Sequence, residues 1–76
     1  MNKIRRKSLQ EIANQITDLR EQLENLQEEE EEYRDSIPEN LQGSKQYEAA
    51  EEAISNIEDA VSFLEDVIGS IEAAAE

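Results

Sequence analysis

The sequence predicts an all-α protein, a long antiparallel hairpin of two helices packed in the manner of a coiled coil. Apolar residues recur at fixed positions of a seven-residue repeat in two segments of the chain, and the only proline lies between these segments. With 76 residues the chain has room for one domain. We therefore expect a single helical-hairpin domain over residues 1–76, with helices at about 3–35 and about 44–75 and a loop at about 36–43.

The second helix has the clearer repeat. Two positions of the repeat, a and d, are apolar: Tyr47, Ile54, Val61, Ile68 and Ala75 at a, and Ala50, Ile57, Leu64 and Ile71 at d. A third position, g, holds Ala53, Ala60, Val67 and Ala74. Because seven residues make about two turns, these positions form one apolar face, wider than the seam of a two-stranded coiled coil. Ser44 is a suitable N-cap, and Glu48 lies in the first turn, where the helix dipole favours an acid.

The first helix follows the same repeat. Its apolar positions are Leu9, Ile16 and Leu23 at a, and Ile12, Leu19, Leu26 and Tyr33 at d, with Glu30 interrupting the a series. Ser8 and Glu11 have the spacing of a capping box. We favour an earlier start capped by Asn2, because no helix-breaking residue lies between Ile4 and Leu9.

The segment RDSIPENLQGS connects the two helices. Pro38 disfavours helical geometry at Ile37, and Gly43 suits a tight turn. A linker this short reverses the chain, so the helices should run antiparallel. The expected neighbours are Tyr33 and Tyr47, Leu26 and Ile54, Leu19 and Val61, Ile12 and Ile68, and Glu30 and Ala50, with Ile37 and Leu41 over the closed end. This interpretation requires the Leu19 and Ile57 side chains to lie in the seam.

One hairpin cannot cover all of its apolar surface. The g positions of the second helix and Phe63, at position c, lie beside the a and d seam rather than in it. We therefore expect a homodimer that forms a four-helix bundle, or equivalent burial against another protein.

Charge and composition restrict the function. Lys3, Arg5, Arg6 and Lys7 open the chain, while residues 8–76 carry 20 acids against three bases, a balance of −17. Such a surface repels nucleic acid and anionic membranes and attracts basic proteins. The chain has no cysteine or histidine, and the consecutive glutamates 28–32 point in different directions on a helix. We therefore expect that the chain is not an enzyme, uses no cofactor, has no metal site and does not bind nucleic acid directly.

Two further features bear on location. No apolar run approaches the ~20 residues that span a bilayer. The basic start is followed by Ser8-Leu9-Gln10-Glu11, where a signal peptide would be apolar. We expect a cytoplasmic protein, with the basic start lying beside Glu72 and Glu76.

The candidate partner-binding residues lie on the second helix: Glu51, Glu52, Glu58, Asp59, Glu65, Asp66 and Phe63. The acids recur as pairs, and a rigid row of carboxylates can mimic DNA in a basic groove. One helix gives one charge per ~5 Å, against one per ~1.7 Å in duplex DNA, so a charged face that serves only solubility is the alternative. Phe63, with Ala60 and Val67, is either a dimer contact or a docking site for another protein.

The stretch YRDSIPENLQGSKQYEAAEEAISNIEDAVSFLED, and IPENLQGS within it, resembles small acidic proteins of phages and integrative elements of Gram-positive bacteria. That group has no established activity, so the resemblance implies a setting on a mobile element. The leading hypothesis is an acidic, DNA-mimic-like interaction protein that inhibits a host defence or nucleic-acid-binding protein. The alternative is a structural or adaptor bundle that binds through its apolar stripe. The loop is either a recognition tip or a packed cap.

Overall fold

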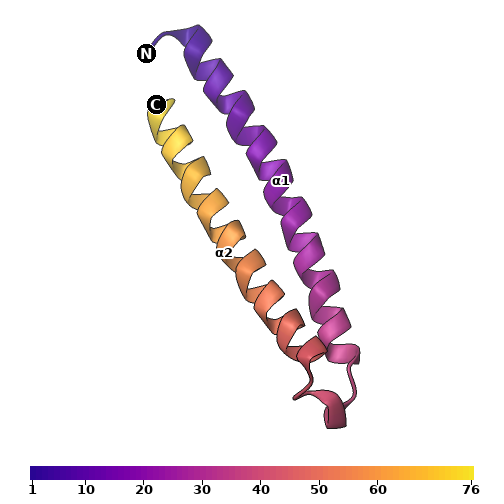
Figure 1. Ribbon diagram of the computed structural model, residues 1–76. Helices are drawn as coiled ribbons and strands as arrows, with labels where there is room; N and C mark the ends of the chain where they lie inside the picture. Colours follow the sequence, from indigo (N-terminus) through magenta and orange to yellow (C-terminus); the bar gives the residue numbers. More distant parts are fainter.

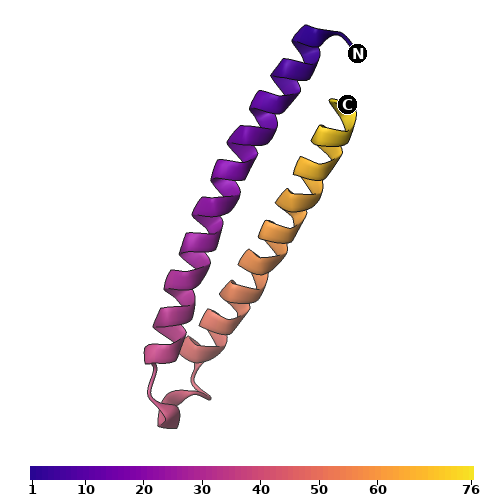
Figure 2. The same ribbon diagram turned by 180° about the vertical axis from the view of Figure 1, so that it is seen from behind.

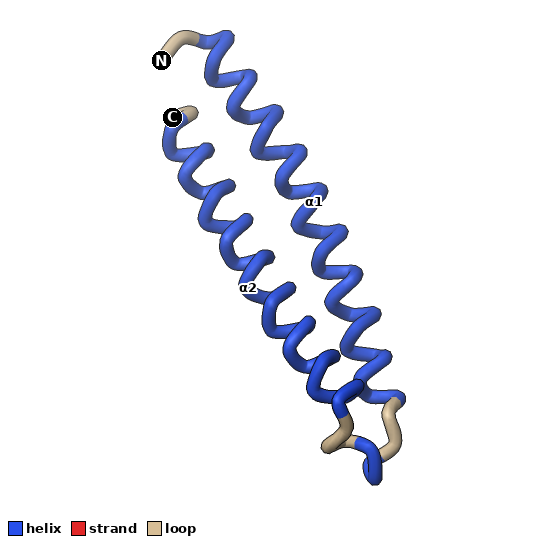
Figure 3. The backbone as a smooth tube through the Cα atoms, in the orientation of Figure 1, coloured by secondary structure: helices blue, strands red, loops and turns tan.

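The computed structural model describes all 76 residues and contains two long helices joined at one end (Figure 1). Helix α1 spans Lys3–Ser36 and helix α2 spans Lys45–Ala74, with one short 3-10 turn, η1, at Glu39–Leu41 between them. There are no strands, and the reverse view and the backbone tube show the same slender pair (Figures 2 and 3). The Cα atoms span 60 × 14 × 12 Å, and both chain ends lie at the same end of the rod. The predicted all-α antiparallel hairpin is confirmed.

Both helices begin at the predicted caps. The Arg5 backbone N–H donates to Asn2 Oδ1 at 2.8 Å, and the Tyr47 backbone N–H donates to Ser44 Oγ at 3.3 Å. Ser8 and Glu11 lie inside α1, so the later start is excluded. Each cap satisfies one of the backbone donors that a helix leaves unpaired in its first turn.

The connection follows the prediction in part. Ile37 is extended, with φ −72° and ψ 126°, as expected before Pro38, and its side chain is 9% exposed over the closed end of the hairpin. Leu41 is 48% exposed, so the expectation that it covers this end is wrong. Gly43 has no positive φ, and the turn therefore does not use the conformations reserved for glycine.

The predicted seam of α2 is confirmed. Ala50, Ile54 and Ile68 are buried. The other a and d residues are partly buried, namely Tyr47, Ile57, Val61, Leu64, Ile71 and Ala75. The seven-residue repeat therefore identified the side of α2 that faces α1.

The predicted seam of α1 is wrong at one of its two positions. The d residues Ile12, Leu19, Leu26 and Tyr33 are between 45% and 54% exposed. Their places in the seam are taken by the residues that follow them, Ala13, Arg20, Gln27 and Arg34, all buried or partly buried. The a residues Leu9, Ile16, Leu23 and Glu30 remain in the seam, partly buried. Helix α1 is therefore turned about its axis relative to the prediction, and Leu19 does not lie between the helices.

The rotation of α1 brings three long polar side chains into the seam. Arg20, Gln27 and Arg34 have long aliphatic stems that can lie along apolar surface while their polar ends reach out of the seam. Arg20 Nε lies 3.4 Å from Glu24, Gln27 Nε2 donates to Glu58 at 3.4 Å, and Arg34 Nε donates to Asp35 at 3.1 Å. The Gln27–Glu58 hydrogen bond lies one turn from Ile54, so the lengthwise register is close to the prediction.

Candidate interaction surfaces

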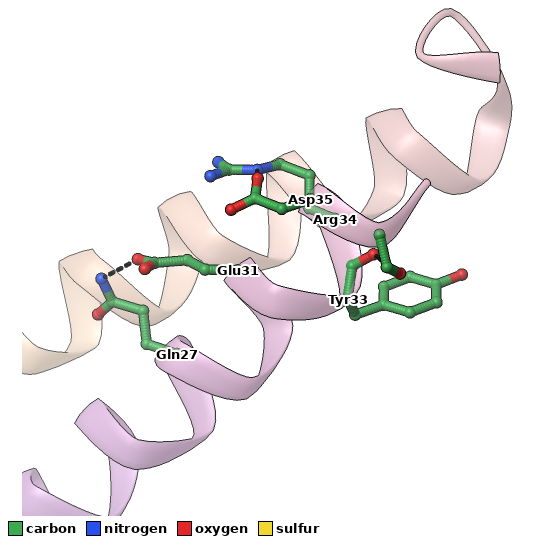
Figure 4. A network of polar contacts seen from close by, with 6 residues as sticks. Gln27, Glu31, Tyr33, Arg34 and Asp35 are labelled. Atoms are coloured by element: carbon green, nitrogen blue, oxygen red, sulfur yellow. Dashed lines mark hydrogen bonds and ion pairs between the residues drawn. The ribbon is translucent and has the colours of Figure 1, made fainter. Parts of the chain in front are cut away.

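The hairpin has two unlike faces. On each helix the seam is flanked by two rows of residues, one on either side, which we call stripes. The preceding stripe lies one residue before the first seam position of each repeat, and the following stripe lies one residue after the second. In an antiparallel pair, the two preceding stripes lie on one face of the hairpin and the two following stripes lie on the other. The preceding stripes are Ile12, Leu19, Leu26 and Tyr33 on α1, and Ala53, Ala60 and Val67 on α2; together they form the apolar face. The following stripes include Glu24 and Glu31 on α1, and Glu51, Glu58, Glu65 and Glu72 on α2; they form the acidic face. Figure 4 shows Tyr33 pointing away from Gln27 and Glu31.

The apolar face is almost free of charge. Its outer borders are Ser8, Gln15, Gln22 and Glu29 on α1, and Ala49, Asn56, Phe63 and Ser70 on α2. Two charged residues lie within this area. Glu29 belongs to the α1 border, and Arg5, seven residues before Ile12, extends the Ile12 stripe towards the chain start. Phe63 is 66% exposed at the α2 border. Met1, Arg5, Ser8, Leu9 and Ile12 line an open depression of about 280 Å³ that extends this face.

The six acids predicted from the sequence lie together along α2, and all are exposed. Glu51, Glu58 and Glu65 belong to the acidic face; Glu52, Asp59 and Asp66 follow them on the side of α2 that points away from α1. We call these six residues the acidic stripe. The two ion pairs of the hairpin are Arg20–Glu24 and Arg34–Asp35, so no carboxylate of the acidic stripe is in an ion pair.

Polar contacts concentrate where the acidic face meets the closed end. Gln27 Nε2 donates to Glu31 at 3.0 Å (Figure 4). It also donates to Glu58 at 3.4 Å. Hydrogen bonding to Glu51 raises the pKa of Tyr47, and desolvation adds to the increase. Hydrogen bonding to Asp35 raises the pKa of Arg34. Of these hydrogen bonds, only Gln27–Glu58 joins the two helices; the others lie within α1 or within α2.

Arg20 is the least satisfied polar group in the seam. Its Nε is buried without a hydrogen bond. The Glu24 carboxylate lies 3.4 Å away and forms an ion pair with Arg20, whose side chain is 27% exposed. The signal in the sequence was present: Arg20 and Arg34 are two repeats apart with Gln27 midway. Both arginines pair with acids of α1 itself, and of these three side chains Gln27 is the one hydrogen-bonded to α2, at Glu58.

Other charged segments form no comparable site. Glu28–Glu32 do not gather into a group of three or more metal-ligating side chains. The basic start and the chain end lie at the same end of the hairpin, yet no ion pair joins Lys3, Arg5, Arg6 or Lys7 to Glu72 or Glu76. No helix has the length and apolar character that a membrane crossing needs.

The fold and surface define a class: a coiled-coil-like helical hairpin with an apolar face and an acidic face. No family model, no curated protein and no solved structure matches the chain. The resemblance to proteins of phages and integrative elements therefore stays a prediction.

Proposed function

We propose that the chain is a non-enzymatic protein-interaction module whose acidic stripe binds a partner with a basic surface. The observation that carries the proposal is that all six carboxylates are exposed and outside the internal ion pairs. A carboxylate outside an ion pair keeps its full charge for attraction to a cationic surface. The α-helix holds the six carboxylates at fixed spacing. A fixed spacing favours recognition of a basic surface over a role in solubility alone.

The charge spacing favours a nucleic-acid-binding protein as the partner. A net charge of −13 along 60 Å gives one charge per about 4.6 Å. Two hairpins side by side would carry −26 over the same length, one charge per about 2.3 Å. Duplex DNA has one per ~1.7 Å. A paired hairpin therefore approaches the linear charge of DNA, and we propose that it inhibits its partner by occupying the groove that binds nucleic acid.

A pair of isosteric variants tests the acidic stripe. In the first, Glu51, Glu52, Glu58, Asp59, Glu65 and Asp66 become glutamine or asparagine. In the second, the same change is made at six acids of α1 outside the seam: Glu11, Asp18, Glu21, Glu28, Glu32 and Asp35. Both lose six negative charges, so a general charge effect would weaken both equally.

The probes are duplex-DNA-binding proteins with basic grooves, preloaded with labelled DNA. We expect the unmodified chain and the α1 variant to displace the DNA, and the α2 variant to fail. Displacement should weaken steeply as salt rises, because charge–charge attraction is screened. Equal displacement by both variants, or indifference to salt, would refute the proposal.

Phe63 supports a second candidate function, an adaptor that binds through its apolar side. Phe63 is 66% exposed at the border of the apolar face, and a continuous exposed apolar patch can mark a protein-interaction site. Binding of this kind would be lost in Phe63→Ala, retained in the α2 acid variant and insensitive to salt.

A further inference from the structure

The apolar face is too regular to be an incidental surface. Leu19 and Leu26 lie in the middle of α1, each more than half exposed, with Ile12 and Tyr33 one repeat to either side. Isolated apolar side chains on a surface are ordinary, whereas a row of four exposed apolar side chains, from Ile12 to Tyr33, marks an interface. The adjoining α2 stripe is small, with Ala53 and Ala60 beside Val67, and small side chains let another helix approach closely.

We propose that a second copy of this chain covers the apolar face, with the two hairpins antiparallel and their connections at opposite ends. The apolar rows run from Ile12 to Tyr33 on α1 and from Ala53 to Val67 on α2. At ~1.5 Å per residue the longer row covers about 32 Å of the 60 Å rod. Packing two such faces against each other gives a four-helix bundle.

The apolar residues are arranged about one point on each helix. Leu19 is the midpoint between Ile12 and Leu26, and Ala60 is the midpoint between Ala53 and Val67. Leu19 and Ala60 lie at about the same level of the hairpin, since the register places Leu19 near Val61. A two-fold axis through this level superimposes each stripe on its own copy, as a self-complementary dimer interface needs.

Charge selects the antiparallel arrangement. The basic residues Lys3, Arg5, Arg6 and Lys7 open α1, and Glu28–Glu32 lie near its other end. When two α1 helices run antiparallel across the axis, the basic end of each lies beside the glutamates of the other copy. With the hairpins parallel, the two basic ends would meet at one end and the two glutamate runs at the other. The basic residues have no ion pair within one hairpin, so they are free for this contact.

Sedimentation equilibrium of the full chain tests the proposal. We expect a dimer, and we expect Leu19→Glu to raise the dimer dissociation constant by more than about tenfold, because a charge would be buried without a partner. The matched control is Asn25→Glu, since Asn25 is exposed on the side of α1 away from α2. Ile4 is 79% exposed on that same side. A monomeric unmodified chain, or equal weakening by both variants, would overturn the proposal.

Cysteine cross-linking tests the arrangement even if Leu19→Glu fails to fold. The chain has no cysteine, so Leu19→Cys places one thiol on each copy next to the two-fold axis. We expect oxidation to give a covalent dimer that retains helical circular dichroism, and Ile4→Cys to give little. Cross-linking between a Leu19→Cys copy and an Ala60→Cys copy, without the Leu19→Cys homodimer, would show parallel hairpins and refute the antiparallel form. The acidic stripe is tested with different residues, so the two proposals can fail separately; a monomeric chain would remove only the comparison of a paired hairpin with the linear charge of DNA.

Discussion

Replacing Arg20 by leucine should stabilise the hairpin, because the arginine occupies a seam position with a buried N–H that has no hydrogen bond. An unsatisfied buried donor costs about 1–3 kcal/mol. The change also removes the Arg20–Glu24 pair, which is four residues apart and partly exposed, and such pairs contribute about 0.3–0.5 kcal/mol. The free energy of unfolding should therefore rise by about 1–2 kcal/mol.

Urea and thermal unfolding followed by circular dichroism measure this change. For a chain of this size, 1 kcal/mol shifts Tm by about 4–8 °C. All chains must be compared at one concentration, because self-association makes Tm concentration-dependent. The control is Glu24→Gln, which removes the ion pair but leaves the arginine in place, and should lower stability by no more than ~0.5 kcal/mol. A loss of stability in Arg20→Leu would show that the guanidinium makes stabilising contacts in the folded protein and refute the reasoning.

Two further predictions concern the start of α2. Ser44→Ala should lower the free energy of unfolding by about 0.5–2 kcal/mol through loss of the cap, measured in urea, with the exposed mid-helix Ser55→Ala as a near-neutral control. In a Tyr33→Phe chain, Tyr47 is the one remaining tyrosine, and its ultraviolet phenolate titration should have a midpoint above ~10 that Glu51→Gln lowers. Since the folded pKa is raised, this contribution to stability is fully present below pH ~10 and is lost as pH rises through the folded value. A midpoint unaffected by Glu51→Gln would contradict the assigned cause.

The repeat was sufficient to predict the helices, the caps and the seam of α2. Ile54 and Ile68 lie on its most apolar side, so any packing of α2 that buries apolar area places them inside. The Asn2 and Ser44 caps depend on local backbone geometry, which the sequence determines within a few residues.

The rotation of α1 could not be predicted from apolar pattern alone. If the hairpin is assumed to have no other partner, the apolar positions a and d of α1 are both placed against α2, because this buries the most apolar area that two helices can bury. A helix that packs against two neighbours can leave one stripe for the second neighbour. The ion pairs of Arg20 and Arg34 lie within α1 and do not depend on its rotation, whereas the Gln27–Glu58 hydrogen bond between the helices needs Gln27 in the seam.

Having a single connection at one end gives folding of the hairpin a direction. Contacts beside η1 join residues near in sequence, whereas the Gln27–Glu58 contact already spans 31 residues and contacts near the termini span still more. The entropy of closing a loop rises with its length, so the first turns to pair are those next to the connection. Each pair shortens the loop that the next must close, and the helices zip towards the chain ends, as expected for a fast-folding helical protein. In the reverse direction, opening is expected to begin at the chain termini, which are furthest from the connection.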